Sequence, residues 1–365
     1  MAVRALESAS RGRQGILASE LGARTDTANA RRNEDRMLRS LLRHGVSARS
    51  TELDDASGGR ERTIRIRYFE AGEGNDQTLL LLHGSGTSDA IASWGPNIPG
   101  LLEKFHIIAP DLPGYGGRSG SEKNHGRSTL GYYINGFLPQ FLERTGVGGR
   151  LDIAGYSLGG GIALGFALSN PSAVANLVLV DAYGLLPSDR EDARRFTLVQ
   201  RLPFMVPQLS PTVGKVLSTS RTLVRWGIAH AERAEEDISE SMVLRMQQNL
   251  RYGFPRAFYE AMHDEIRKDG FATNYMNRLH ELDAAGVGAF FIHGQRDMLL
   301  PPSASEEASR RIAGAWLWMP DGCGHGPHLD KPKEFNDLVL AFLSRRDDAI
   351  LNSSKMPFGS LIRPA

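Results

Sequence analysis

Residues 150–160, RLDIAGYSLGG, place one serine between two glycines directly after an apolar-leaning run. Where a strand turns sharply into a helix, the two come into close contact, so the positions beside the turn tolerate little beyond glycine. Gly155 and Gly159 supply that room, and the following stretch LGGGIALGFALSN has the small residues of a helix packed on a sheet. The pattern predicts a strand, a tight turn at Ser157 and a helix.

Such a turn would lift the Ser157 hydroxyl above the sheet, at the N-terminus of the helix. Free backbone N–H groups at that end of a helix favour developing negative charge. The context therefore favours a nucleophilic serine. The alternative is a glycine-rich turn whose serine is inert.

Short apolar runs alternate with longer helical stretches on both sides of this turn. The first run alternates apolar and polar residues like a half-exposed antiparallel edge, whereas most later runs are continuously apolar, as in strands buried on both faces. We predict an α/β fold with a mostly parallel, eight-stranded sheet and its chemistry at the carboxyl ends of the strands. The strands are expected at residues 49–54, 62–72, 77–84, 104–111, 150–157, 175–182, 288–294 and 315–321.

About a hundred residues between the sixth and seventh of these strands show helical periodicity and no clear strand, too long a stretch for an ordinary connection. We predict a helical cap, or lid, inserted there at residues 186–284, above the carboxyl ends of the strands. The α/β core then comprises residues 49–185 and 285–346, and residues 347–365 form a loosely ordered tail.

Residues 1–48 form a predicted N-terminal extension that is partly helical. Its helix either docks a partner or lies on its own domain, and the amphipathic pattern favours the second interpretation.

Composition limits the class of partner. The 365 residues include 43 Lys and Arg against 42 Asp and Glu, a net charge of +1. This balance gives no electrostatic reason to expect nucleic acid or an anionic membrane as the main partner, so a small-molecule substrate is expected. The sequence does not define the oligomeric state.

The compartment predicted from the sequence is the cytoplasm. The single cysteine, Cys323, excludes an intramolecular disulfide and is consistent with a reducing environment. The N-terminal segment lacks the apolar run of a signal peptide, and no later stretch approaches the ~18 apolar residues of a membrane span. An organellar transit peptide is disfavoured by Glu7, Glu20 and Asp26.

A nucleophilic serine needs hydrogen-bond donors for the oxyanion that forms when it attacks a carbonyl. The stretch LLLLHGSG ends a predicted strand at residues 83–86, where small residues let the Ser85 amide turn inward. We expect the Ser85 and Leu158 amides to form the oxyanion hole. His83 precedes the nucleophile in the chain and is interpreted as a structural residue of this loop.

The nucleophile also needs a base and an orienting acid. Asp297 follows the predicted strand FFIHG and is our candidate acid, with Asp181 at the end of LVLVDA as a rival. His325, between two glycines after the last strand, is the candidate base and is favoured over His328. No Cys/His metal-ligand spacing appears, and we expect neither a metal nor a cofactor.

Taken together, residues 62–346 resemble the α/β-hydrolase superfamily, in particular its lid-bearing serine hydrolases. The resemblance rests on the order Ser157, Asp297, His325 and on the stretches HGSG, SDAIASW, APDLPGYGGRS and GHGPHLDKPKEF. It implies a Ser-His-Asp catalytic triad. A serine nucleophile, where dehalogenases and epoxide hydrolases of this superfamily carry Asp, disfavours those two chemistries.

The HGSG stretch and the strand LVLVD also resemble the meta-cleavage-product hydrolases, which have an HGSG-like stretch and an LVLVD…GGL-like strand and cut carbon–carbon bonds in ring-fission products. Those enzymes carry GNSMGG where this chain has GYSLGG, and a Trp after the base where this chain has Gly326. These two differences affect the part of carbon–carbon hydrolysis in which the dienolate is handled. We therefore expect a carboxylic ester hydrolase acting on a small, mainly hydrophobic ester or lactone first, and carbon–carbon hydrolysis second.

Two further alternatives remain open at this point. A peptidase would use a carboxylate of AERAEEDISE in the cap to hold a substrate amine, but charge runs are usually solvated. A ligand receptor or scaffold with vestigial turnover would use the N-terminal helix for docking. Deleting residues 1–48 would separate the second from an enzyme, which should keep its turnover.

Overall fold

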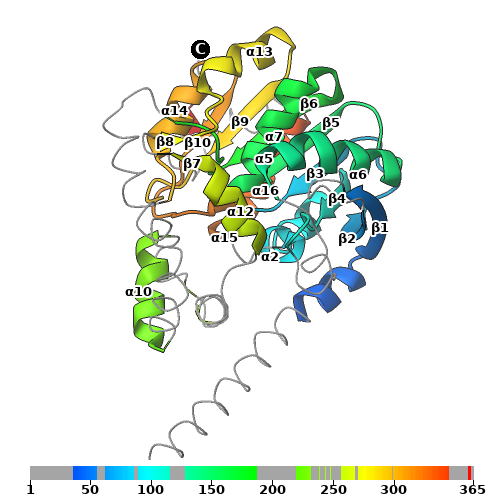
Figure 1. The fold of residues 1–365 in the computed structure, drawn as a ribbon, viewed down its shortest axis with the longest axis horizontal. Coiled ribbons are helices and arrows are strands. Elements are labelled where there is room, and N and C mark those ends of the chain that lie inside the picture. The colour runs from blue at the N-terminus through cyan, green and yellow to red at the C-terminus, as the bar shows by residue number, and fades with distance from the viewer. Residues whose placement is uncertain are drawn as a thin grey trace, which may run out of the picture.

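The computed structural model describes the α/β core and parts of the segments around it. The described residues are 36–55, 62–85, 89–115, 128–186, 219–231, 238, 243, 247, 256–267, 270–297, 299–344 and 361–362. Figure 1 shows the strands in the middle of the molecule with helices on both sides.

The central sheet confirms the predicted α/β class and all eight predicted strands. In spatial order these are β1 (Ser47–Asp55), β2 (Arg62–Ala71), β4 (His106–Pro110), β3 (Thr78–Leu82), β5 (Leu151–Tyr156), β6 (Val174–Val180), β9 (Gly288–Ile292) and β10 (Trp316–Trp318). β1 pairs antiparallel with β2, and β2 with β4. Within the series β4, β3, β5, β6, β9 and β10, each strand is parallel to the next.

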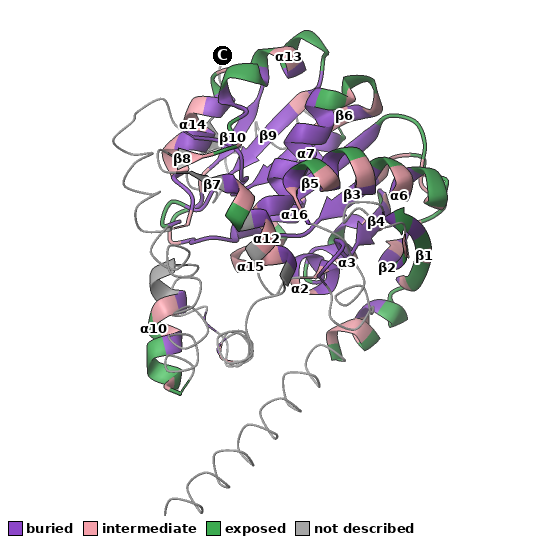
Figure 2. Cartoon of the chain, in the orientation of Figure 1, coloured by how far each residue is buried: buried purple, intermediate pink, exposed green. Residues whose placement is uncertain are grey.

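Helices cover both faces of the sheet because alternate residues of each strand point to opposite sides. On one face Leu80, Ile153 and Leu179 belong to a core cluster shared with α6 (Leu138–Thr145), α7 (Leu158–Ser169), α13 (Leu279–Ala284) and α14 (Pro302–Ser309). On the other face Leu81, Ala154 and Val180 belong to a cluster shared with α2 (Ala90–Trp94), α3 (Ile98–Leu101) and α16 (Pro332–Leu343). Figure 2 shows the central strands buried and the edge strand β1 largely exposed.

The short helical elements complete the connections between these layers. They are α5 (Leu130–Tyr132), the π-helical turn η1 (Tyr133–Phe137), the 3-10 turns η2 (Pro171–Ala173) and η4 (Met276–Arg278), and α15 (Pro327–Asp330). Residues 36–43 form the end of the predicted N-terminal helix. Its Leu41 is buried in the same cluster as Trp94, so this part of the extension lies on its own domain.

The two differences from the expected strand pattern are short. The tail, expected to be loosely ordered, adds a two-residue strand, β11 (Leu361–Ile362), antiparallel to β10. The interval expected to be helical contains a two-stranded pair, β7 (Ile266–Arg267) and β8 (Gly270–Phe271). Neither segment is long enough to show an alternating or continuous apolar pattern, which is why sequence reasoning missed both.

Much of the predicted cap, residues 186–284, lies outside the described residues. Its described helices are α10 (Arg221–Ala231), which stands apart from the sheet in Figure 1, and α12 (Arg256–Glu265). α12 is tied to the end of β6 because the Tyr183 hydroxyl donates to the buried Glu265 carboxylate at 2.9 Å. The last part of the interval, with Met276 and Leu279, packs into the core cluster.

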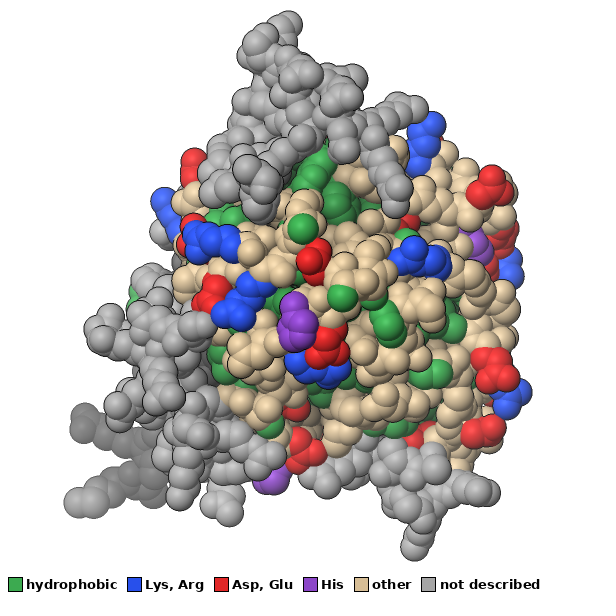
Figure 3. Space-filling view, turned by 90° about the horizontal axis from the view of Figure 1, so that it is seen from above, with side chains coloured by type: hydrophobic (Ala, Val, Ile, Leu, Met, Phe, Trp, Pro, Cys, Tyr) green, Lys and Arg blue, Asp and Glu red, His purple; other side chains and the backbone are tan. Residues whose placement is uncertain are grey.

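The described part of the chain contains no helix with the length and apolar character that a membrane crossing requires. On the face shown in Figure 3, Lys and Arg side chains are interspersed with Asp and Glu side chains.

Candidate active site

Ser157 occupies the turn between β5 and α7, as the sequence predicts, and its backbone is strained. Its φ of 53° and ψ of −115° lie in a region that residues other than glycine rarely adopt. Four backbone hydrogen bonds around the turn hold it there. The Ser157 amide donates to the Val180 carbonyl at 2.9 Å, and the Ser157 carbonyl accepts from the amides of Gly160 at 3.0 Å, Gly161 at 3.2 Å and Tyr183 at 2.9 Å.

The glycines beside the turn are required by backbone contacts. A Cβ atom at Gly155 would lie 2.7 Å from the Cα of Gly160, and one at Gly159 would lie 2.7 Å from the carbonyl oxygen of His83. Both separations are shorter than real Cβ contacts allow. The strand, the helix and the loop after β3 therefore meet at Ser157 with no room for side chains at these two positions.

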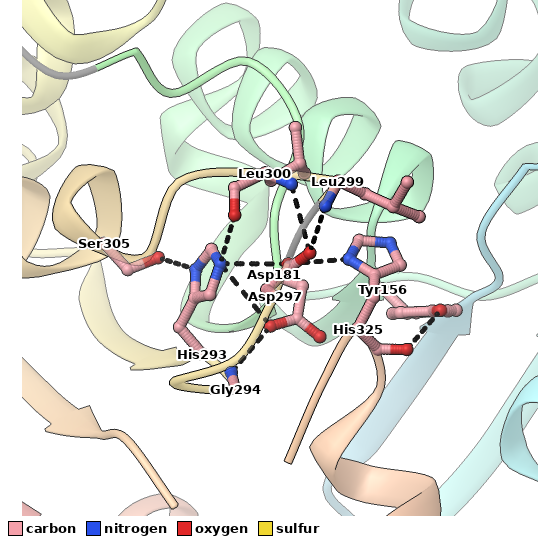
Figure 4. A network of polar contacts seen from close by, with 9 residues as sticks. All are labelled: Tyr156, Asp181, His293, Gly294, Asp297, Leu299, Leu300, Ser305 and His325. Atoms are coloured by element: carbon pink, nitrogen blue, oxygen red, sulfur yellow. Dashed lines mark hydrogen bonds and ion pairs between the residues drawn. The ribbon is translucent and has the colours of Figure 1, made fainter. Parts of the chain in front are cut away.

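Asp297 and His325 are brought together although they are 28 residues apart in the chain. The Asp297 Oδ2 accepts a hydrogen bond from the His325 Nδ1 at 2.7 Å (Figure 4), and both side chains are buried. The Oδ1 of Asp297 accepts from the amides of Leu299 at 2.7 Å and Leu300 at 3.1 Å. With Nδ1 donating to Asp297, the Nε2 of His325 is the ring nitrogen that can take up a proton.

His293 is a buried member of this network that sequence reasoning missed. Its Nε2 lies 3.1 Å from the Oδ2 of Asp297, and its Nδ1 lies 2.7 Å from the Ser305 hydroxyl. Burial works against the charged form of Asp297, yet His325 and His293 together hold the pKa of Asp297 below its usual range. The position of His293, directly after β9 and four residues before Asp297, was the available signal.

Asp181, the rival acid, lies at the end of β6 and shares this network without bonding to His325. Its Oδ1 accepts from the Gly294 amide at 2.9 Å and lies 3.7 Å from the Nε2 of His293. Burial raises the pKa of Asp181 to about 6, and the charge of Asp297 adds to the rise while His293 and His325 oppose it. It is thus Asp297, not Asp181, whose oxygen lies within hydrogen-bond distance of the imidazole.

Tyr156 connects the serine turn with the histidine loop. Its ring packs 5.2 Å from that of His325 and 4.6 Å from that of His328, and its hydroxyl donates to the His325 carbonyl at 3.2 Å. His328, the rival base, also packs against Trp94 and Phe335. The residue next to Ser157 therefore contacts His325 directly, through both ring and hydroxyl.

The loop after β3 lies against Ser157, as the oxyanion prediction requires. A Cβ atom at Gly84 would come within 2.9 Å of the Tyr156 ring and 3.3 Å of the Ser157 Cβ. Leu158 begins α7 on the other side of the serine and is buried. Gly84, the residue before Ser85, therefore lies close to Ser157, and Leu158 follows Ser157 in the chain.

His83 holds the peptide that carries the Ser85 amide. Its Nδ1 donates to the Gly84 carbonyl at 2.7 Å, and its Nε2 accepts from the Leu112 amide at 2.9 Å. Burial lowers the pKa of His83 to about 4, which keeps the ring neutral and able to make both bonds. Because the C=O and N–H of a trans peptide point in opposite directions, fixing the Gly84 carbonyl also fixes the direction of the Ser85 amide.

Three groups at this edge of the sheet have the spacing of a metal-ligand set. One ligand atom from each of Asp181, Asp297 and His325 lies within 4.8 Å of the others. In this structure, however, Asp297 and His325 are hydrogen-bonded to each other. This contact is a hydrogen bond between a carboxylate and an imidazole.

A family model described as the alpha/beta hydrolase family matches residues 79–338. This match covers most of the chain. The chain belongs to the α/β-hydrolase family. The expected superfamily is confirmed, and the described Ser157 turn and the Asp297–His325 pair lie within the matched residues of this hydrolase.

Relatives of this α/β-hydrolase include both of the enzyme classes considered above. It is 28% identical over 295 residues to 2-hydroxymuconate semialdehyde hydrolase from Pseudomonas sp. strain CF600, covering 79% of this chain and 94% of the relative. Carboxylesterase CesB from Bacillus subtilis has a similar fold, with a TM-score of 0.60 and 18% identity, covering 87% of this chain and 98% of that one. A membrane phospholipase A described as a bacterial virulence factor gives a TM-score of 0.65 with 22% identity, covering 92% and 97%.

Proposed function

We propose that this α/β-hydrolase cleaves a small, mainly hydrophobic carboxylic ester or lactone through an acyl-enzyme. The proposal rests on two observations: Ser157 lies in a strained strand-to-helix turn, and the buried His325 donates its Nδ1–H to Asp297 at 2.7 Å. A serine held in this way and a base with a fixed tautomer are the two requirements of nucleophilic acyl transfer.

In the proposed reaction the Ser157 Oγ attacks the carbonyl carbon while the Nε2 of His325 takes its proton. Asp297 keeps the proton on Nδ1 and stabilises the imidazolium that forms. The Ser85 and Leu158 amides donate to the oxyanion, each contributing ~2.7 to 4 kcal/mol to the transition state. His325 then protonates the leaving alkoxide, and the acyl-enzyme is hydrolysed by a water molecule that His325 activates.

The domain boundaries of the sequence analysis are part of this proposal. The cap at residues 186–284 would select the apolar group of the substrate, since the interval follows β6 at the carboxyl edge of the sheet. Its described residues Val224, Ile228, Ile238 and Val243 form an apolar cluster of their own, which supports a separately packed unit. We also infer a cytoplasmic location from the single cysteine.

Carbon–carbon hydrolysis is the second candidate, and the similarity to 2-hydroxymuconate semialdehyde hydrolase over most of both chains favours it. It would use the same serine, histidine and aspartate. The ester reaction is preferred because the Gly326 and Tyr156 positions depart from the residues that the resemblance implies for the dienolate.

A substrate panel tests the proposal. We would compare kcat/KM for p-nitrophenyl butyrate, a γ-lactone and 2-hydroxymuconate semialdehyde, with Ser157→Ala as the control. The proposal predicts the highest value for the ester or the lactone, abolished by Ser157→Ala. A dominant rate on the ring-fission product would place carbon–carbon hydrolysis first, and ester turnover that persists in Ser157→Ala would contradict the mechanism.

A further inference from the structure

Asp181 has the features of a residue held for a purpose other than packing. It is the first residue after β6. In the sheet, β6 lies between β5, which leads to Ser157, and β9, which leads to Asp297. It is fully buried, and its φ of 42° is unusual for a residue other than glycine. Its amide donates to the Ile292 carbonyl at 2.8 Å, which fixes it against the end of β9.

The two carboxylate oxygens of Asp181 have different surroundings. Oδ1 accepts from the Gly294 amide at 2.9 Å. Oδ2 is buried and has no hydrogen-bond partner among the described residues. Leaving a buried carboxylate oxygen unsatisfied costs free energy, so its retention here needs a reason.

The reason suggested by the geometry is the imidazole of His325. The nearest ligand atoms of Asp181, Asp297 and His325 lie within 4.8 Å of one another. Figure 4 shows the two carboxylates next to each other, with His293 and His325 on either side. In the intact site Asp297 accepts the hydrogen bond from the His325 Nδ1–H at 2.7 Å, and Asp181 is a second carboxylate near the same N–H group.

We propose that Asp181 is a second positioning carboxylate for His325, which supports the imidazole together with Asp297 and takes over its Nδ1–H when Asp297 is lost. This proposal rests on the function proposed above. A negatively charged carboxylate near His325 stabilises the imidazolium, whether the hydrogen bond from Nδ1 goes to Asp181 or to Asp297. Burial is the main cause of the raised pKa of Asp181 and the charge of Asp297 adds to it, so removal of that charge would favour the ionised form of Asp181.

The proposal makes an unusual prediction about Asp297. An Asn at this position would donate its amide to Nδ1 and hold the wrong tautomer of His325, a change that lowers activity about 10⁴-fold in serine hydrolases. An Ala would instead leave room for Asp181 to accept from Nδ1. Asp297→Ala should therefore keep about 10²-fold more activity than the more conservative Asp297→Asn.

The test is the second-order rate constant for labelling of Ser157 by a fluorophosphonate probe, measured in a double-mutant cycle. We expect Asp181→Asn to lower it about 3- to 10-fold, Asp297→Ala about 10²-fold, and the double variant about 10⁴-fold, well beyond the product of the two. Asp152→Asn is the matched control, since Asp152 is a buried carboxylate on β5 bonded to Gln77 and Asn176. Combined with Asp297→Ala, it should lower the rate constant no further than Asp297→Ala alone.

Circular dichroism would establish that each variant is folded, and Asp297→Ser replaces Asp297→Ala if the latter is not. Effects of Asp181→Asn and Asp297→Ala that simply multiply, or a better activity of Asp297→Asn, would overturn the second-carboxylate proposal while the parent enzyme is still labelled. A parent protein that is not labelled at Ser157 would overturn the proposed function itself.

Discussion

The substitution Gly159→Ala tests whether the contact between α7 and the loop after β3 positions the site. The new methyl group would lie 2.7 Å from the His83 carbonyl oxygen and 2.7 Å from the Leu82 carbonyl carbon. Both are backbone atoms, so no side chain can move aside. The Leu82 carbonyl oxygen would be closer still, so reaching an ordinary contact of 3.4 Å requires the helix and the loop to separate by more than about 0.7 Å.

That displacement defines the expected size of the effect. Overpacking of a rigid interior costs roughly 1–3 kcal/mol, which for a protein of this size lowers Tm by roughly 1–4 °C. The same shift moves Ser157 and the Ser85 peptide apart, and catalytic groups must be held within about 0.5 Å of their productive geometry. We expect ester kcat/KM to fall about 10²-fold.

The assays are thermal unfolding followed by circular dichroism and the hydrolysis of p-nitrophenyl butyrate. Gly148→Ala is the control, because a Cβ there meets nothing within 4 Å and its φ is not positive. It should leave activity unchanged and raise stability by roughly 0.4–1 kcal/mol. A Gly159→Ala enzyme with the stability and activity of the parent would refute the packing argument.

Three further predictions concern His83, Asp181 and the N-terminal extension. His83→Ala should lower kcat about 10- to 100-fold with little change in KM and weaken inhibition by a boronic acid. His83→Asn should restore part of both, because its amide can donate to the Gly84 carbonyl. Equal losses in the two variants would contradict the role of His83 in fixing the Ser85 amide. Because the pKa of Asp181 is raised to about 6, the folded protein retains a proton that the unfolded chain loses between about pH 4 and pH 6, so stability falls as pH rises through that range. Urea unfolding should show Asp181→Asn gaining roughly 1–3 kcal/mol relative to the parent between pH 4 and pH 7.5, and a constant difference would count against the raised pKa. Deleting residues 1–35 should preserve ester turnover, whereas deletion to residue 48 removes the buried Leu41 and the start of β1 and should lower Tm by several degrees. Equal Tm values would show that residues 36–48 contribute little to stability.

The sheet was predictable because its strands have the simplest possible signature. Strands such as LLLL before His83 and LVLV before Asp181 are buried on both faces, so they are continuously apolar in sequence. The first two strands alternate because the edge of the sheet is half exposed. The deletion at residue 48 first considered for the extension would cut into β1, since that strand begins at Ser47.

The positions of the candidate residues were also predictable, because glycines and strand ends mark them. The turn at Ser157 requires Gly155 and Gly159, and Asp297 and His325 each follow a strand at the same edge of the sheet. How close these residues lie to one another depends on the pairing of β5, β6, β9 and β10, which no single stretch encodes.

Two members of the network were not predictable in their roles. His293 follows an apolar strand and reads as an ordinary core histidine, although its ring is 3.1 Å from Asp297. Asp181 was recognised as a strand-end carboxylate, but its unpartnered oxygen and its nearness to Asp297 arise from long-range packing. Asp181 is more than a hundred residues from His293, Asp297 and His325 in the chain, so its place in the network depends on the pairing of β6 with β9.

The most direct test of the central claim is intact-mass measurement after fluorophosphonate labelling of the parent and of Ser157→Ala, with the modified peptide mapped. An activated serine predicts one adduct per chain, located on Ser157 and absent from the variant. A folded parent protein that gains no adduct, or that carries it on another residue, would contradict the assignment of Ser157 as the nucleophile.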